Sequence, residues 1–385
     1  MCKKMKNEYL LSIVVPTKNR YPYLFELLEL IESFHLDRVE VVIQDNNEDN
    51  KEILEYFKSW GGKPSYITYD WHKESISVSL NSDYAVLNSH GEYICFIGDD
   101  DGFCPQIIDA VKFMKEYGVD ALLSSVTFYN WPDYYDPSIF KLYSSIQFVK
   151  GSGKLYKINP LKELENCIYH GFDGLYRMPH AYQSIVSRSI MDKLYSIYGT
   201  YFPGPSPDMA NAVALSLLEP KTYYFDGPIV VSGQSRSVGG GERLLKSNKL
   251  KRIDEVSHLP KNIHECWNPK LPIYWCADTI WPQSGIMPLI RREEYLKIVN
   301  YEMILARFVF YHRSYYAECE PLLENKTKFY FCLLKFVLNK LIVFIDHRLS
   351  YFVTRGKRLS NSHIVRNMLN MKNAIDYLSQ YSFKK

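Results

Sequence analysis

The chain has 385 residues, of which 46% are hydrophobic and 23% are charged, so two domains are expected and wholesale disorder is excluded. The net charge of +3 is too small to indicate nucleic acid as the main partner. Eight cysteines are scattered without the spacing of a zinc site, which favours free thiols in a reducing compartment.

The first half of the chain alternates short apolar runs with helical patterns. The predicted elements are strands over 11–15, 39–43, 65–69, 93–97 and 121–126, and helices over 23–34, 51–60, 78–89 and 107–117. Strands that alternate with helices of about a dozen residues predict right-handed crossovers and a mostly parallel sheet. Ligands bind beyond the carboxyl ends of such strands. We therefore expect the polar clusters at 17–20, 45–47 and 99–101, which all follow strands, to meet at one edge of the sheet.

The second half begins irregularly and becomes helical. Residues 131–154 are rich in Tyr, Ser, Pro and Asp and are expected to form loops over the site. The next predicted elements are helices over 161–170, 189–198 and 209–218, and strands over 182–187, 222–225 and 229–231. After a glycine run at 239–241 the sequence pattern becomes largely helical, so we expect one domain over 1–240 and a mainly helical region over 241–385.

The most apolar stretch of the C-terminal region covers residues 330–345. Lys335, Asn339 and Lys340 interrupt it on roughly one face of a helix, and it is too short and too charged for a bilayer span. A buried amphipathic helix is expected, with docking on a membrane surface as the alternative.

The remaining features that bear on location are the amino terminus and two basic runs. Residues 1–9 are polar and lack the apolar run of a secretory signal, which predicts a cytoplasmic protein. The basic runs at 246–252 and 355–358 are interpreted as solvated faces, or alternatively as weak contacts with anionic lipid headgroups. Peripheral contact with the inner face of the cell membrane through the C-terminal region is therefore the alternative to a protein free in the cytoplasm.

Three consecutive acids, Asp99, Asp100 and Asp101, follow the apolar strand at 93–97 directly. Adjacent carboxylates repel one another unless a cation or a hydrogen-bond donor compensates them. Mg²⁺ and Mn²⁺ prefer carboxylate oxygens, and Mg²⁺ often shares them with substrate phosphates. A solvated acidic turn before the helix that starts near Pro105 is the alternative, but the position at a strand end favours a metal–diphosphate site.

Three segments carry a resemblance to a known family: residues 12–20 (SIVVPTKNR), 41–47 (VVIQDNN) and 91–101 (GEYICFIGDDD). In this order and at this spacing they resemble the family 2 glycosyltransferases of the GT-A fold, over roughly residues 9–240. The resemblance implies an α/β, Rossmann-like nucleotide-diphospho-sugar transferase domain, followed by a mostly helical C-terminal region. It also implies a divalent cofactor, Mn²⁺ or Mg²⁺.

The resemblance also implies roles for individual residues. Those expected to bind the nucleotide-sugar are Pro16, Thr17, Asn19, Arg20, Asp45, Asn46, Asn81, Asp99 and Asp100, and those expected to hold the metal are Asp99, Asp100 and Asp101. Asp45 is expected to accept a hydrogen bond from the base, as a carboxylate can from uracil N–H. Many members carry an acid where this chain has Gly98, so the frame of the metal motif stays open between Asp99-x-Asp101 and Gly98-Asp99-Asp100.

Asp208 opens a predicted helix after the proline-rich segment 203–207. In the family, an acid at the comparable place serves as the catalytic base. An inverting transfer needs a carboxylate near the acceptor hydroxyl, opposite the leaving group. The alternative is an N-cap, a role that Asp fills well. Residues 232–237 with 239–241 are expected to form either a mobile loop, in which Arg236 neutralises the leaving diphosphate, or a simple linker.

The resemblance implies transfer of a sugar from a nucleotide-diphosphate donor to a saccharide or lipid-linked saccharide in polysaccharide synthesis, with inversion; Asp45 favours a UDP-sugar. A bacterial capsule or lipopolysaccharide is the product that the family suggests. Two alternatives stay open: a nucleotidyltransferase that makes nucleotide-sugars, and a catalytically silent carbohydrate-binding or scaffold protein. The acceptor, the linkage and the oligomeric state are not predicted by the sequence.

Overall fold

The computed structural model describes residues 9–134, 142–236, 250–256, 258–260, 262–353 and 362–384. The expected domain boundary near residue 241, the glycines at 239–241, the basic run at 355–358 and most of the run at 246–252 lie outside these residues.

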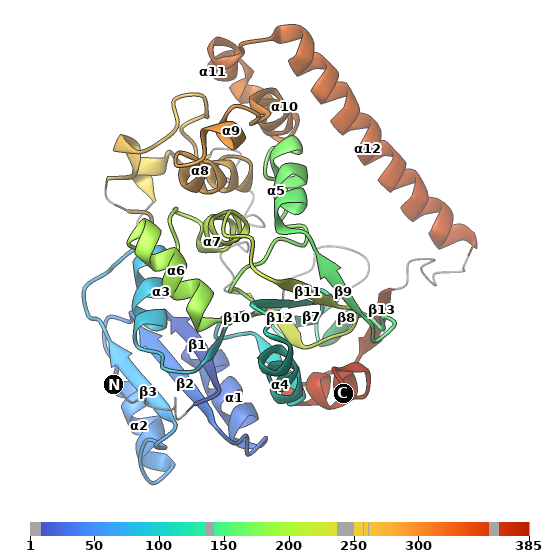
Figure 1. The fold of residues 1–385 in the computed structure, drawn as a ribbon. Helices are drawn as coiled ribbons and strands as arrows, with labels where there is room; N and C mark the ends of the chain where they lie inside the picture. The colour runs from blue at the N-terminus through green and yellow to red at the C-terminus, as the bar shows by residue number, and fades with distance from the viewer. Residues whose placement is uncertain are drawn as a thin grey trace.

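A mixed eight-stranded sheet forms the centre of the amino-terminal part (Figure 1). Its strands, in spatial order, are β3 (Ile67–Trp71), β2 (Val39–Asp45), β1 (Leu11–Thr17), β4 (Tyr93–Phe96), β10 (Ile185–Ser187), β6 (Ala121–Ser124), β11 (Thr222–Phe225) and β9 (Leu155–Ile158). Only β10 and β9 run against the other six strands. The prediction of a mostly parallel sheet is therefore confirmed.

Helices cover both faces of this sheet, which explains why the central strands are apolar on both sides. Ile13 and Val15 face a core built with α1 (Tyr21–Glu32), α2 (Lys51–Ser59) and α4 (Ile107–Tyr117). Val14, which points to the opposite face, packs with α3 (Val78–Leu87), α6 (Arg188–Tyr198) and α7 (Pro207–Ser216). With both faces covered, a ligand reaches these strands most readily at their ends.

A second sheet corrects the expectation that residues 131–154 form only loops. Its strands, in order, are β13 (Ser362–Arg366), β8 (Ser145–Val149), β7 (Phe128–Asn130), β12 (Val230–Gln234) and β5 (Gly102–Phe103). The prediction fails at β8 because this strand pairs with β13, more than 200 residues further along the chain. The predicted loop at 232–237 is likewise partly a strand, since β12 runs to Gln234.

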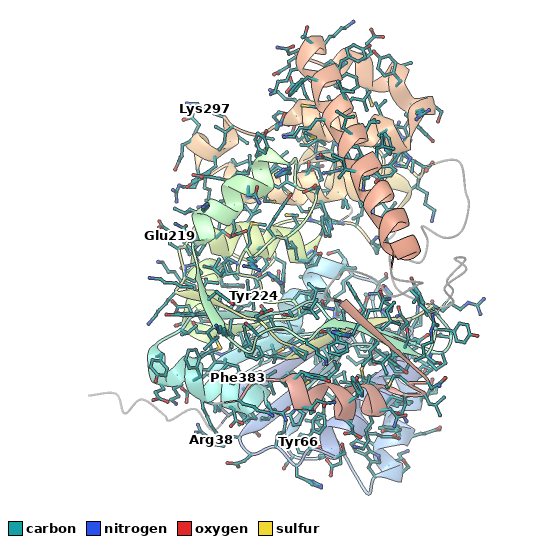
Figure 2. The ribbon with its side chains drawn as sticks, turned by 90° about the vertical axis from the view of Figure 1, so that its right-hand side faces the viewer. Arg38, Tyr66, Glu219, Tyr224, Lys297 and Phe383 are labelled. Carbon is teal, nitrogen blue, oxygen red and sulfur yellow. The ribbon has the colours of Figure 1, made fainter. Side chains whose placement is uncertain are left out.

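The end of the chain returns to the amino-terminal core. Helix α13 (Met371–Leu378) buries Met371, Ile375 and Leu378 in the same core as Ile13. The ring of Phe383 lies 5.0 Å from that of Phe225. In Figure 2, Phe383 lies at the same end of the molecule as Arg38 and Tyr66, far from Lys297 in the helical part. The division at 240/241 stays a prediction, and within the described residues the last segment belongs spatially to the first half.

The region between these parts is mainly helical, as predicted. It contains α8 (Ala277–Leu289), α9 (Glu293–Leu296), α10 (Tyr301–Tyr311), α11 (Tyr316–Cys319) and α12 (Lys326–Val353). Ile280 and Ile286 of α8 share a core with Met209 and Val213 of α7, and α5 (Pro160–Tyr169) adds Leu164 to it. The helical region therefore packs directly on the helix that carries Asp208 (Figure 1).

Helix α12 contradicts the prediction of a buried amphipathic helix over residues 330–345. The helix is present, but Phe331 is 67% exposed and Ile342 is 63% exposed. Hydrophobic periodicity predicts an apolar face without showing what covers it. In the structure α12 packs against α10, and Tyr316 of α11 and Tyr169 of α5 also contact it, but these contacts leave Phe331 and Ile342 exposed. Within the described residues, no helix combines the length and the apolar character needed to cross a bilayer.

Candidate active site

The three acids lie buried at the carboxyl edge of the central sheet. Asp99, Asp100 and Asp101 are each at most 2% exposed and connect the end of β4 to β5. The Thr17 hydroxyl, at the end of β1, donates to Asp99 Oδ2 over 2.7 Å. The Asn46 N–H, which directly follows β2, donates to the Thr17 carbonyl over 3.0 Å. The structure thus brings together the three polar clusters that follow strands.

Arg20, which was expected to bind the nucleotide-sugar, lies against the acids. Its Nε is 3.1 Å from Asp99 Oδ1, and its Nη2 is 2.5 Å from Asp100 Oδ2. The Ser235 hydroxyl completes this arrangement, because it accepts from Arg20 Nη2 over 2.9 Å and donates to Asp100 over 2.7 Å. Burial alone would lower the pKa of Arg20, but the charges of Asp99 and Asp100 raise it. One guanidinium therefore compensates part of the charge of three carboxylates.

Asp101 is held by protein donors at both of its oxygens. Oδ1 accepts from the Gly233 N–H over 2.7 Å, Oδ2 accepts from the Gly98 N–H over 2.7 Å, and the Gln183 amide lies within 3.1 Å of both. A side chain at Gly233 is impossible without rearrangement, since a Cβ there would lie 1.8 Å from the Asp100 carbonyl oxygen. Asp101 is therefore positioned by β12 and by the segment before β10.

A divalent cation fits the chemistry of these carboxylates. Burial raises the pKa of Asp99 to about 7, with Arg20 opposing and Asp100 adding to the shift. Burial and the charge of Asp100 likewise raise the pKa of Asp101 to about 7. Asp99 Oδ1 is buried without a hydrogen bond, because the nearby Arg20 Nε–H is not aligned with it. Excess negative charge and a carboxylate oxygen without a hydrogen bond are what Mg²⁺ or Mn²⁺ would compensate.

Gly98 makes room for the acids. A Cβ at this position would lie 3.2 Å from Asp100 Oδ1 and 3.3 Å from Asp101 Oδ2. An acidic side chain there would add a further negative charge to the cluster. Because Gly98 has no side chain, the space beside Asp100 Oδ1 stays open. No described residue donates a hydrogen bond to this oxygen.

Asp45 lies beside Thr17 in the register of β1 and β2 but is already hydrogen-bonded. It accepts from the hydroxyls of Tyr21 over 2.5 Å and Tyr69 over 2.8 Å, and from the Asn47 N–H over 2.9 Å. Burial raises its pKa. Because Asp45 is fully buried, contact with a base would require the two tyrosines to move, and its role stays a prediction.

The other predicted nucleotide residues lie near the strand ends in different settings. Asn46 holds the segment after β3, since its amide donates to the carbonyls of His72 and Glu74 over 2.8 and 2.7 Å. Asn19 has a φ of 59°, and its N–H donates to the Asn47 side chain. Two more positions complete the predicted set: Pro16, which lies within β1, and Asn81, whose buried Oδ1 has no hydrogen-bond partner among the described residues.

Asp208 occupies the first turn of α7 with one oxygen unused. Ser206, not Asp208, is at the N-cap position, which argues against the N-cap alternative. Asp208 Oδ1 accepts from the Met209 N–H over 2.8 Å and from the Ser206 hydroxyl. Oδ2 accepts no hydrogen bond from the described residues, and the side chain is only half-buried. One carboxylate oxygen is therefore left for another group.

Tyr182 connects Asp208 to the acidic cluster electrostatically. The pKa of its hydroxyl is raised well above the usual value, first by burial and then by the charges of Asp101, Asp100 and Asp208. The charges of all three carboxylates therefore act on one phenol. Sequence reasoning missed Tyr182 and Gln183 as site residues, because a polar residue beside a short strand carries no motif of its own. It included Ser235 in the segment 232–237 but gave a role there only to Arg236.

A cavity of about 200 Å³ adjoins this centre. Gln183, which binds Asp101, forms part of its wall, as do His180, Arg177 and Ser232. The His180 ring is held through Nδ1 by the Met178 carbonyl at 2.7 Å, and burial lowers its pKa. A hollow with neutral donors and a cationic side chain beside a carboxylate cluster is suited to a polar ligand.

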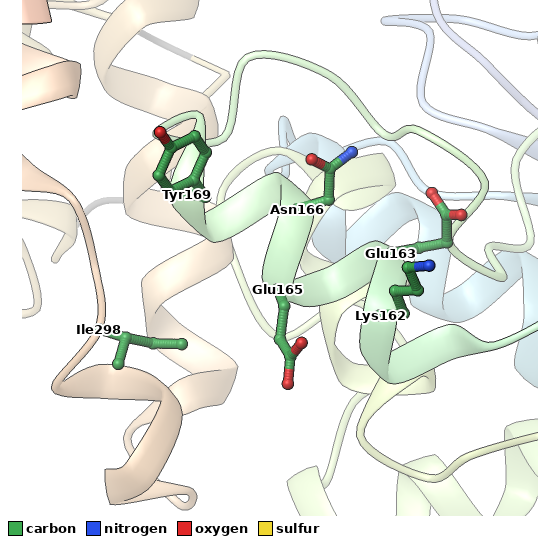
Figure 3. A pocket seen from close by; sticks show the side chains of 6 residues that line it. All are labelled: Lys162, Glu163, Glu165, Asn166, Tyr169 and Ile298. Carbon is green, nitrogen blue, oxygen red and sulfur yellow. The ribbon is translucent and has the colours of Figure 1, made fainter.

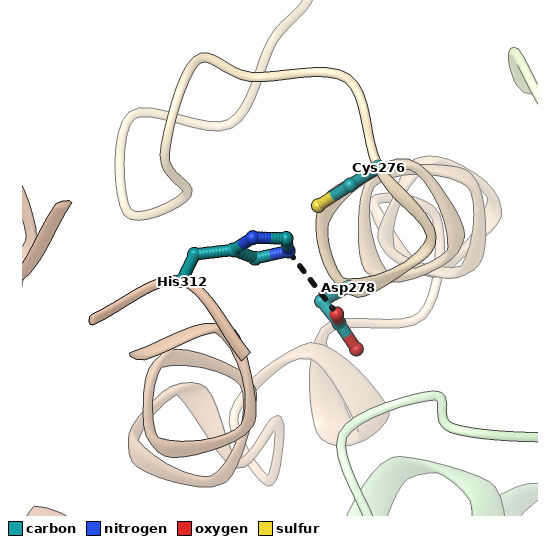
Figure 4. Close-up of side chains that lie close together, drawn as sticks. All are labelled: Cys276, Asp278 and His312. Atoms are coloured by element: carbon teal, nitrogen blue, oxygen red, sulfur yellow. Dashed lines mark ion pairs between the residues drawn. The ribbon is translucent and has the colours of Figure 1, made fainter. Parts of the chain in front are cut away.

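Two other features of the helical side are separate from the acids. A hollow of about 580 Å³ lies over α5, lined by Lys162, Glu163, Glu165, Asn166, Tyr169 and Ile298 (Figure 3). Cys276, Asp278 and His312 bring ligand-type atoms within 4.8 Å of one another (Figure 4). The buried Arg307 already pairs with Asp278 Oδ1 over 2.7 Å, so the charge of this carboxylate is compensated without a metal ion. We assign this cluster no part in catalysis.

Replacement of Arg20 by glutamine tests whether the acids carry charge. The Arg20→Gln variant is expected to lose about 3 kcal/mol of unfolding free energy, because buried carboxylates lose their cation. Thermal unfolding with and without Mn²⁺ measures this, and Mn²⁺ should stabilise the variant more than the wild type. Equal stability of variant and wild type without metal would mean that the acids are neutral and that Arg20 does not compensate them.

The fold and the site together define a class of protein: an α/β domain with a buried acidic centre, suited to a divalent cation, at the carboxyl edge of a mostly parallel sheet. Residues 12–179, which contain this centre, match the sequence profile described as "Glycosyl transferase family 2". Over this stretch, which is less than half of its length, the chain is similar to glycosyltransferase family 2, and its fold is a mixed α/β fold like that of the GT-A glycosyltransferases with a helical C-terminal region.

Individual relatives are distant. A protein of Rickettsia felis described as "Uncharacterized glycosyltransferase" is 30% identical over 101 residues, a match that spans 26% of this chain and 16% of that protein's length. Residues 1–349 of S. aureus TarS with UDP-GlcNAc superpose with a TM-score of 0.49 at 14% identity, covering 86% of this chain and 92% of that one. The same protein with UDP gives 0.42 at 18% identity, with 59% of this chain and 61% of that one covered.

Proposed function

We propose that this protein transfers a sugar from a nucleoside-diphosphate donor to a hydroxyl group of a saccharide or lipid-linked saccharide, with inversion at the anomeric carbon. The observation that carries the proposal is the buried cluster of Asp99, Asp100 and Asp101, joined to Thr17 and Arg20 at the carboxyl edge of a family 2 domain. A diphosphate needs positive charge at such a place, and a divalent ion shared with the carboxylates supplies it.

Asp99 and Asp100 are the residues proposed to hold Mn²⁺ or Mg²⁺, with Asp101 next to them. Asp99 Oδ1 lacks a hydrogen bond, whereas both oxygens of Asp101 are occupied by protein donors. When bound, the ion stabilises the negative charge that develops on the leaving diphosphate. Arg20 then no longer has to neutralise the acids alone, and its guanidinium is suited to a phosphate oxygen.

Asp208 is proposed as the base that removes the acceptor proton. Its free oxygen, its charge, which acts on the same Tyr182 hydroxyl as the charges of Asp100 and Asp101, and its place next to the helical region support this role. The cavity beside Gln183 and His180 is proposed to receive a sugar, since its wall offers neutral hydrogen-bonding groups and lies against Asp101. Asp45 is proposed to favour a UDP-sugar by accepting a hydrogen bond from the uracil base. For this contact the hydroxyls of Tyr21 and Tyr69 have to move away from the Asp45 carboxylate.

The biological setting is proposed on broader grounds. The similarity of residues 12–179 to family 2 supports polysaccharide synthesis, such as capsule formation, with a lipid-linked intermediate as one acceptor. All seven described cysteines are free, which fits a reducing compartment such as the cytoplasm. Contact with the inner face of the membrane through the C-terminal region would bring the enzyme to such an acceptor.

A screen of nucleotide-sugars tests the proposal. Thermal unfolding is measured with UDP-, GDP- and TDP-sugars, each with and without Mn²⁺, and one donor is expected to stabilise the protein only when Mn²⁺ is present. That donor is then incubated with saccharide acceptors, and release of the nucleoside diphosphate is measured. Formation of pyrophosphate from a sugar phosphate and a nucleoside triphosphate would instead indicate a nucleotidyltransferase. Metal-dependent donor binding without release on any acceptor would indicate a silent binding protein.

A further inference from the structure

Helix α12 exposes a row of large apolar side chains that the proposed reaction does not use. Between Lys326 and Ile342, where its side chains are described, seven apolar residues are 38–67% exposed: Tyr330, Phe331, Leu334, Val337, Leu338, Leu341 and Ile342. In Figure 1 the helix runs along the outer edge of the molecule. An exposed apolar row of this length on a folded protein indicates an interaction surface.

The seven side chains form one continuous face. With 3.6 residues per turn, they fall within an arc of about 140° around the helix axis. The buried residues Phe329 (0% exposed) and Cys332 (4%) point the other way, into the core that they share with Leu305 and Phe308 of α10. The inner face of α12 is therefore already buried against α10, and the outer face is a separate apolar surface.

The charges beside this face have one sign. Lys326, Lys328, Lys335 and Lys340 lie between residues 326 and 342, and no Asp or Glu does. Lys326 and Lys328 pair with Glu320 and Glu302. Lys335 and Lys340, on either side of the apolar arc, contact aromatic groups, and neither has a carboxylate partner within the described residues. Two uncompensated positive charges therefore flank the apolar face.

We propose that the outer face of α12 docks on an anionic lipid bilayer, with its axis in the plane of the surface. An apolar face flanked by lysines matches the boundary between acyl chains and negatively charged headgroups, and Tyr330 suits that boundary because its ring is apolar and its hydroxyl polar. A second copy of the chain fits less well, because a symmetric pairing of two α12 helices would bring Lys335 and Lys340 of both copies together. The inference does not depend on the proposed reaction.

Vesicle sedimentation of the full chain tests the proposal. The protein is expected to bind vesicles that contain about a quarter phosphatidylglycerol more tightly than pure phosphatidylcholine vesicles, and about 1 M NaCl should remove that difference. The double variant Leu334→Ser/Leu338→Ser should bind anionic vesicles about tenfold more weakly or worse. Lys335→Gln/Lys340→Gln should lose only the preference for anionic lipid.

A matched control keeps the test independent of folding. Leu54→Ser/Leu369→Ser changes two leucines that are 41% and 71% exposed elsewhere, and it should bind vesicles like the wild type. Thermal unfolding of all variants shows whether they are folded. Unchanged vesicle binding by Leu334→Ser/Leu338→Ser, or no binding of the wild type to anionic vesicles, overturns the proposal. A wild-type dimer that this variant converts to a monomer in sedimentation velocity would assign the face to a second copy.

Discussion

Replacement of Asp99 by asparagine is expected to reduce sugar transfer about a thousandfold. The change keeps the shape of the side chain and one acceptor for the Thr17 hydroxyl but removes a negative charge from the cluster. A metal contributes several kcal/mol to stabilising a diphosphate leaving group, and each 1.4 kcal/mol is a factor of about ten in rate. Steady-state kinetics with the donor found by thermal screening measure the loss.

The same variant has a readout that does not depend on turnover. In the wild type, Mn²⁺ should raise the unfolding temperature, and chelation with EDTA should reverse the effect. In Asp99→Asn that increase should shrink or vanish, while the metal-free protein should be no less stable, since one repulsive charge is gone. A full Mn²⁺ effect on the variant would show that Asp99 is not a metal ligand.

Glu40 offers a matched control at the other end of the same strands. It is 1% exposed and accepts from the Ser12 hydroxyl over 2.6 Å and from the Gly91 N–H over 3.0 Å. Glu40→Gln therefore also neutralises a buried carboxylate near β1 and β2, but at the edge of the sheet away from Asp99. It should cost some stability and leave the Mn²⁺ effect intact. An equal loss of transfer in both variants would point to general damage to the sheet.

The central sheet could be predicted because its signals are local. Buried parallel strands are continuous apolar runs, so β1, β2 and β4 are visible in the sequence, and the turn residues after them mark the edge where ligands bind. Strand β8 shows the opposite case. Its residues became a strand through pairing with β13, and no property of residues 145–149 alone indicates that distant partner.

The sequence predicted which residues lie at the site better than it predicted which of them contact one another. Thr17 and the acids at 99–101 do meet, because neighbouring parallel strands end at the same edge. Arg20 was expected to bind the nucleotide-sugar, which stays a prediction; its ion pairs with Asp99 and Asp100 were not foreseen. The contacts of Gln183 and Ser235 with the acids could not be found from sequence, since these residues reach the acids from segments more than 80 residues away.

The sequence could not decide between a buried and an exposed apolar face for α12. The spacing of apolar residues predicts a helix and its faces. Whether a face is buried depends on whether another element lies against it, and α12 packs on α10 through Phe329 and Cys332 while the face that carries Phe331 and Ile342 stays exposed. Its lysines were taken as interruptions of the apolar stretch, whereas in the structure they border it. The spacing of these residues in the sequence therefore favours a buried helix, whereas their exposure in the structure shows a helix on the surface.

Replacement of Asp208 by asparagine is expected to lower kcat by two to four orders of magnitude, the usual contribution of a general base. Donor affinity should stay unchanged, because Asp208 lies in α7 and is not one of the carboxylates bound to Thr17 or Arg20. Asparagine keeps an acceptor for the Met209 N–H, so the first turn of α7 should persist. Donor binding by thermal shift and kcat by initial rates separate these two effects.

Asp109 is a suitable control, since it also lies in the first turn of a helix, α4, with an exposed side chain near Lys112. Both Asp208→Asn and Asp109→Asn remove an acid that interacts favourably with a helix N-terminus, so both should cost stability similarly, by about 0.5 kcal/mol. Only the first should slow transfer. Near-normal transfer by folded Asp208→Asn would mean that another group takes the acceptor proton. His180 would be the next residue to replace, because its ring lies in the wall of the cavity beside Asp101 and its lowered pKa keeps it neutral.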